Sequence, residues 1–181
     1  LEIAVYDFYS DQLIWGMHAY RNTVRWVQTE ENLFVDHCPL SSEEHMYDDS
    51  VLAPAAYHCK NPSPFQGFYY GVHKALKMTQ PGRSEKDYHQ TVSKWHIIQK
   101  TRQHFGRRGD IRLGYAVLGA EVAFRGVIEP RHLDCTNPYL RERFEPYAEL
   151  DTSQVTREIR KLSLMNFGFL PERVRRSLLV R

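Results

Sequence analysis

Apolar side chains recur along this chain at intervals of three and four residues, a spacing that places them on one face of an α-helix. The first such stripe predicts a helix of about 15 residues, which Ser10 or Asp11 would cap. Its apolar positions are Leu13, Met17, Tyr20, Val24 and Val27. No window alternates cleanly between apolar and polar residues, so the pattern gives almost no indication of a β-strand.

Capping and helix-breaking residues predict three further helices in the first two thirds of the chain. Ser41 and Glu44 have the spacing of a capping box and predict a helix start. The proline-containing segment 61–64 ends that region with extended backbone. Amphipathic helices are then expected at 65–78 and 84–105. Their apolar positions are Phe65, Phe68, Val72 and Leu76 in the first, and Tyr88, Val92, Trp95 and Ile98 in the second.

Residues 104–130 are the most informative part of the chain. Residues 106–109 begin and end with glycine and predict a turn, after which Asp110 is expected to cap a helix. That helix, at 111–125, is apolar on nearly every side and contains several small residues. Such a helix is typically buried between neighbours that approach it closely. Gly126 and Pro130 are expected to end it.

The C-terminal part predicts three more helices. The first begins at Thr136-Asn137-Pro138, the second is capped by Asp151-Thr152-Ser153, and the third begins at Pro171. The apolar stripe of the second is Val155, Ile159 and Leu162.

These elements together predict an all-α protein of about seven or eight helices, arranged as antiparallel pairs in an α-solenoid. The chain is interpreted as a single helical domain over 1–181. Its parts are N-terminal helices at 1–60, repeat-like helix pairs at 64–130 and C-terminal helices at 131–181.

The composition is that of a globular protein and narrows the possible partners. The net charge of +2 argues against a broad nucleic-acid surface. Arg outnumbers Lys and Tyr is abundant, a bias that is typical of protein interfaces but also arises from genome composition. The longest apolar run covers only residues 113–120, whereas a transmembrane helix needs about 20 residues. The chain begins without Met, which fits either a mature product or a trimmed start.

Two His-Cys pairs are the only candidate metal ligands in the sequence. His37-Cys38 and His58-Cys59 could together form a Cys2His2 zinc site, although adjacent ligands diverge on regular backbone. A disulfide between Cys38 and Cys59 and two unrelated buried thiols are the alternatives, and the last is favoured. We therefore predict no cofactor.

Motifs of the common enzyme classes are missing from the sequence. There is no HExxH, G-x-S-x-G, P-loop or G-x-G-x-x-G segment, and the nine His residues are scattered. The sequence therefore favours a chain without catalytic residues of its own.

The helix–turn–helix unit at 94–130 resembles a pentatricopeptide repeat. The turn Arg108-Gly109-Asp110 matches the turn between the two helices of that repeat, and the segment 125–130 matches its exit, with a basic residue, Gly, β-branched residues and Pro. The segment Gly109-Asp110-Ile111-Arg112-Leu113-Gly114-Tyr115 after Trp95 is similar to the small pentatricopeptide-type subunit on the F1 head of euglenozoan mitochondrial ATP synthases. Tyr6-Asp7-Phe8 and Trp15 resemble the N-terminal part of that family.

This resemblance implies a non-catalytic accessory subunit in mitochondria, in the matrix or associated with the inner membrane. Its partners would be larger subunits of the complex, with the F1 head of ATP synthase expected first. An RNA-binding helical-repeat protein and an accessory subunit of a respiratory complex are the alternatives. The residues expected to contact a partner are Trp26, Arg107, Arg108, Arg112, Tyr115 and Tyr139.

Overall fold

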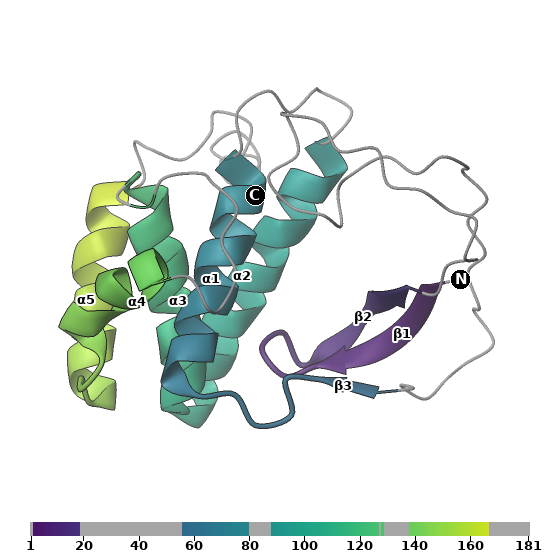
Figure 1. Ribbon diagram of the computed structural model, residues 1–181, viewed down its shortest axis with the longest axis horizontal. Helices are drawn as coiled ribbons and strands as arrows, with labels where there is room; N and C mark the ends of the chain where they lie inside the picture. The colour runs from purple at the N-terminus through teal and green to yellow at the C-terminus, as the bar shows by residue number, and fades with distance from the viewer. Residues whose placement is uncertain (1, 19–55, 80–87, 127, 129–137, 167–181) are drawn as a thin grey trace.

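The structure, a computed structural model, describes residues 2–18, 56–79, 88–126, 128 and 138–166. Its elements are β1 (Glu2–Asp7), β2 (Gln12–His18), β3 (Ala56–His58), α1 (Pro64–Thr79), α2 (Tyr88–Arg108), α3 (Ile111–Phe124), α4 (Pro138–Phe144), the short 3-10 helix η3 (Glu145–Tyr147) and α5 (Thr152–Asn166). The fold is mostly helical, with a small three-stranded sheet beside the helices (Figure 1). The expectation of an all-α protein was therefore too narrow.

The N-terminal sheet replaces the helix that was expected from Leu13 onward. β1 and β2 form an antiparallel hairpin, and its turn contains Ser10 and Asp11. Side chains of this kind cap helices, but they also hydrogen-bond to nearby backbone in turns, so the sequence alone did not distinguish the two roles. Asp11 adopts φ 54°, a left-handed conformation that suits a turn and not a helix start. The spacing of Leu13 and Met17 was therefore misleading.

The third strand comes from a distant part of the chain. β1 lies in the centre of the sheet, antiparallel to β2 and parallel to β3, with Asp7 opposite His58. β3 has only three residues and was not expected from the sequence. The prediction of helices at 1–60 was thus wrong for the described strands, while the helix expected at Ser41 lies outside the described residues.

The helices α1 and α3 cross in backbone contact, which glycines make possible. A Cβ on Gly71 would lie 1.8 Å from the Ala116 carbonyl oxygen, and one on Gly119 would lie 2.1 Å from the Phe68 carbonyl oxygen. Both distances are far below van der Waals contact. The expectation that small residues let neighbours approach this helix closely is confirmed, and its most extensive interface is with α1.

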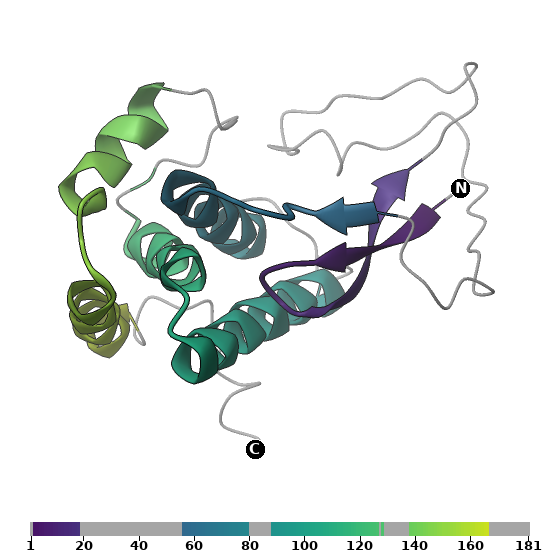
Figure 2. The same ribbon diagram turned by 90° about the horizontal axis from the view of Figure 1, so that it is seen from below.

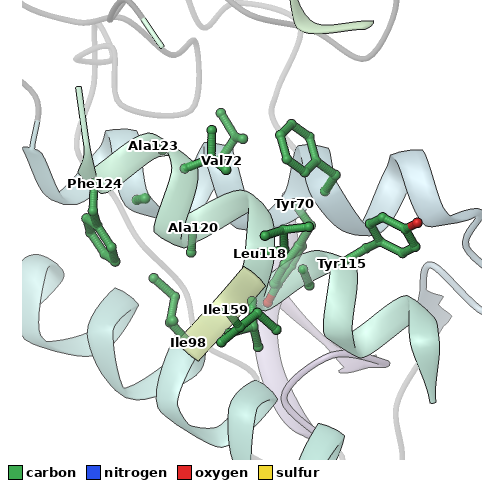
Figure 3. Close-up of a cluster of buried hydrophobic side chains, with 14 of the residues drawn as sticks. Tyr70, Val72, Ile98, Tyr115, Leu118, Ala120, Ala123, Phe124 and Ile159 are labelled. Atoms are coloured by element: carbon green, nitrogen blue, oxygen red, sulfur yellow. The ribbon is translucent and has the colours of Figure 1, made fainter. Parts of the chain in front are cut away.

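Helix α3 is the centre of the helical body. Every residue from Leu113 to Phe124 is buried, and α1, α2 and α5 all pack on it. Figure 3 shows Leu118, Ala120 and Phe124 of α3 among Ile98 of α2 and Ile159 of α5. Figure 2, seen from below, shows these helices beside one another. Burial of α3 on several sides is confirmed, but a helical bundle has the same property, so the solenoid stays a prediction.

The predicted helix boundaries are largely reproduced because they depend on local hydrogen bonds. The Asp110 carboxylate accepts from the Arg112 backbone N–H at 3.0 Å and caps α3, as expected. Asp151 and Gln154 form a reciprocal capping box at the start of α5. The turn before α3 is shorter than expected, because α2 continues to Arg108 and only Gly109, at φ +64°, turns the chain. The helix expected at Pro171 lies outside the described residues.

Candidate functional site

A cluster of chemically active side chains lies where the sheet meets helix α1. Asp7 ends β1, His58 ends β3 and Cys59 follows it, while Tyr70 faces them from α1. The parallel pairing of β1 with β3 brings Asp7 beside His58 across 51 positions of sequence. The cluster therefore depends on the sheet that the sequence pattern did not predict.

The Asp7 carboxylate is fully buried and is saturated with hydrogen bonds. Its Oδ1 lies 2.8 Å from His58 Nδ1. Its Oδ2 accepts from the Ser10 backbone N–H at 2.8 Å, from the Ser10 hydroxyl at 2.6 Å and from the Tyr70 hydroxyl at 3.1 Å. A buried carboxylate is stable only when such partners replace water. These contacts join the hairpin turn, β3 and α1 at one residue.

The hydrogen bonds favour the charged forms of both partners. Burial alone would raise the pKa of Asp7, but the hydrogen bonds from His58 and Ser10 outweigh this effect and lower the pKa below 3.8. The hydrogen bond to Asp7, followed by the contact with Cys59, raises the pKa of His58 to about 9 against the opposing effect of burial. At neutral pH the pair is therefore an ion pair of carboxylate and imidazolium.

Cys59 lies on the other side of the imidazole. Its Sγ is 4.0 Å from His58 Nε2, so the three side chains form a line of carboxylate, imidazole and thiol. Cys59 is partly buried and is a free thiol, so the alternative of a Cys38–Cys59 disulfide does not hold in this structure. Its φ of 56° is left-handed, which turns the chain away from β3.

The zinc site considered from the sequence lies only in part among the described residues. His58 and Cys59 are brought together, but Asp7 occupies the Nδ1 side of the imidazole. No group of three or more potential ligands that could hold a metal ion occurs among the described residues. His37 and Cys38 lie outside the described residues.

Two of the arginines expected at a partner surface make contacts within the chain. Arg108 forms an ion pair with Asp11 at 2.6 Å. Arg112 forms an ion pair with Asp110, donates to the Asn61 side chain at 2.6 Å and lies over the Phe8 ring. Both side chains therefore attach the sheet and its connections to the helical body. They keep some exposure, and their role toward a partner stays a prediction.

The other predicted contact residues differ in exposure. Tyr115 is only 1% exposed, and its hydroxyl donates to the carbonyl oxygens of Tyr147 and Leu150, so it stabilises the fold and cannot touch a partner in this conformation. Arg107 is exposed, and Tyr139 is half-buried beneath Arg143. Trp26 lies outside the described residues.

The outer face of α5 is an exposed surface that the sequence analysis missed. Arg157, Arg160, Lys161 and Leu164 are all exposed, and their spacing places them on one side of the helix. Leu164 is 86% exposed, the largest value among the exposed large hydrophobic residues. This exposed surface could have been predicted from the sequence, because its four positions lie on the side of the helix opposite the apolar stripe that begins at Val155.

No family model, curated protein or solved structure matches this chain.

Proposed function

We propose that this chain is a non-catalytic accessory subunit of a mitochondrial multi-subunit complex, with the F1 head of ATP synthase as the first candidate. The observation that supports the proposal is the helix pair α2–α3. It has the Arg108-Gly109-Asp110 turn and the Asp110 cap in the region that carries the family resemblance, and its second helix is enclosed by protein. A rigid body of this kind suits a scaffolding role, because it presents side chains from fixed positions.

The described residues contain no helix that is long and apolar enough to cross a membrane. The proposed association with an inner-membrane complex therefore rests on protein contacts in this part of the chain.

The outer face of α5 is the surface that we propose for the partner. Leu164 supplies an apolar side chain, and Arg160 and Lys161 supply positive charge next to it. Interface centres combine apolar and Arg contacts in this way, because the guanidinium both packs and donates hydrogen bonds. The surface would fit a partner with an apolar pocket bordered by carboxylates.

Affinity purification of the tagged chain from mitochondria of its source cell tests the proposal. We expect F1 subunits in the eluate, in constant ratio to the tagged chain. Recovery of a respiratory complex instead would favour that alternative, and salt-sensitive recovery of RNA would favour the RNA-binding alternative. Absence of any stoichiometric partner would refute the accessory-subunit proposal.

The double variant Arg160→Glu/Leu164→Asp tests the surface itself. Both residues are exposed, so the fold should be unchanged while the partner is lost from the eluate. Arg107→Glu is a charge-reversal comparison on α2, at a position expected from the sequence to contact a partner. Loss of the partner with Arg107→Glu alone would move the proposed surface from α5 to the turn between α2 and α3.

A further inference from the structure

The line of Asp7, His58 and Cys59 has the geometry that activates a nucleophilic thiol. Because the pKa of Asp7 is lowered, its carboxylate is ionised at neutral pH and can only accept hydrogen bonds. The 2.8 Å contact with His58 Nδ1 therefore requires a proton on that nitrogen. The Nε2 atom faces Cys59 Sγ on the other side of the ring, where the imidazolium N–H can donate to a thiolate.

Asp7 fixes the position of the imidazolium ring. The carboxylate is itself held by Ser10 and Tyr70, so the ring is anchored from the interior of the protein. The 4.0 Å separation between Nε2 and Sγ is long for a hydrogen bond, as is common for a nucleophile and its partner before a substrate is bound.

A second and independent observation is the hydroxyl group of Tyr9. Tyr9 is fully buried, and its hydroxyl has no hydrogen-bond partner, which is rare for a buried polar atom. Burial raises the pKa of Tyr9. Its ring stacks on that of Tyr70 with the centroids 3.9 Å apart, and Tyr70 in turn donates to Asp7. An unused donor is therefore buried beside this site.

The surroundings of the thiol are accessible and carry a net positive charge from Lys60, because His58 and Arg112 are each paired with a carboxylate. Cys59 is partly exposed, and Lys60 next to it is exposed. Arg112 reaches the same loop through its hydrogen bond to Asn61. A small anionic molecule would be attracted to this position.

We propose that Cys59 is a reactive thiol and a site of modification by small anionic disulfides, with the His58 imidazolium stabilising the thiolate and Asp7 as the positioning residue. Sγ loses its proton to water, the His58 Nε2–H donates to the resulting thiolate, and the thiolate attacks one sulfur of the disulfide. The new bond joins Cys59 to that sulfur, the old S–S bond breaks, and the departing thiolate takes a proton from His58, which regains one from water. One disulfide and one thiol enter the exchange, and one mixed disulfide and one thiol leave it. This inference is independent of the proposed accessory role.

The test uses a variant in which Cys38 and Cys135 are replaced by Ser, so that Cys59 is the remaining thiol. The protein is incubated at pH 7 with glutathione disulfide, and the mixed disulfide is followed by intact mass. We expect the folded protein to react about tenfold faster than the same chain unfolded in urea. Equal rates would overturn the proposal. We also expect glutathione disulfide to react faster than the cationic disulfide cystamine, and the reverse order would overturn the proposed anionic class.

His58→Asn is the decisive substitution. An Asn amide can still donate to Asp7 while nothing replaces Nε2 beside the sulfur, and His58 is 40% exposed, so the fold should tolerate the change. We expect the folded rate to fall about tenfold, to that of the unfolded chain, with unchanged circular dichroism. An unchanged rate would exclude His58 as the group that stabilises the thiolate. If this variant does not fold, the proposal is still decided by the reaction rates of the folded and unfolded protein that retains His58.

Discussion

Because α1 and α3 cross in backbone contact, we expect that replacing Gly71 by a larger residue strongly destabilises the protein. In Gly71→Ala the new Cβ would lie 1.8 Å from the Ala116 carbonyl oxygen and 2.7 Å from the Ala120 backbone nitrogen. Normal contact needs more than 3 Å, so the two helices must separate by about 1.5 Å. Both obstacles are backbone atoms of a buried helix and cannot rotate away.

The expected cost is large for a chain of this size. Overpacking at a contact without room typically costs 1–3 kcal/mol, and we expect about 3 kcal/mol for Gly71→Ala because no flexible side chain can yield. For a protein of 181 residues this lowers Tm by roughly 6–12 °C. Gly106→Ala is the matched control, since Gly106 lies within α2 and its Cβ would meet nothing within 4 Å. That substitution should stabilise the protein by about 0.5–1 kcal/mol through better helix propensity.

Urea titration and thermal melting, both followed by far-ultraviolet circular dichroism, measure the two variants against the wild type. We expect the same Gly→Ala substitution to lower the free energy of unfolding at Gly71 and to raise it at Gly106. A Gly71→Ala protein within about 0.5 kcal/mol of wild type would show that α1 and α3 do not cross in backbone contact. If Gly106→Ala destabilised the protein by a similar amount, the cost of Gly71→Ala could not be attributed to the packing of α1 against α3.

Two further predictions concern the polar contacts. The pKa of His58 is raised to about 9 in the folded protein, so protonated His58 stabilises the fold fully below pH 6.5, the pKa of the unfolded chain, and this stabilisation is lost as pH rises through 9. The pKa of Asp7 is lowered, so the stabilisation from its carboxylate is lost as pH falls below 3.8. His58 is partly exposed, so we expect the free energy of unfolding, measured by urea titration, to fall by only about 1–2 kcal/mol between pH 6 and pH 10. This fall should be absent in His58→Asn. Identical pH profiles for the two proteins would contradict the ion pair. Tyr115→Phe removes the donor to two backbone carbonyls and should cost about 1–2 kcal/mol in the same urea assay, whereas no loss would mean that water satisfies those carbonyls equally well.

The sequence predicted the helical body well because its signals are local. The stripes at 65–78 and 155–162, the cap at Asp110 and the exit at Gly126 each depend on residues within one or two turns of helix. The burial of α3 could also be inferred, since an apolar surface on every side must be covered by protein.

The sheet and the candidate site could not be predicted in the same way. β3 has only three residues and pairs with a strand about 50 positions earlier, so no periodic sequence pattern predicts it. His58 and Cys59 were recognised as a pair from the sequence, but their partner Asp7 was not. The Asp7-to-Ser10 spacing does favour a side-chain turn, and this was the one local sign that the carboxylate is used for structure. Its neighbour across the sheet becomes visible only in three dimensions.

The parallel pairing of β1 and β3 has a consequence for the order in which the protein folds. The contact between Asp7 and His58 closes a loop of 51 residues, which costs about 3.5 kcal/mol of chain entropy, whereas α2 and α3 are joined by a two-residue turn. Long loops close late in folding and open early in unfolding. We therefore expect the thiol beside His58 to belong to the part of the molecule that assembles last, so that its reactivity would report whether assembly is complete.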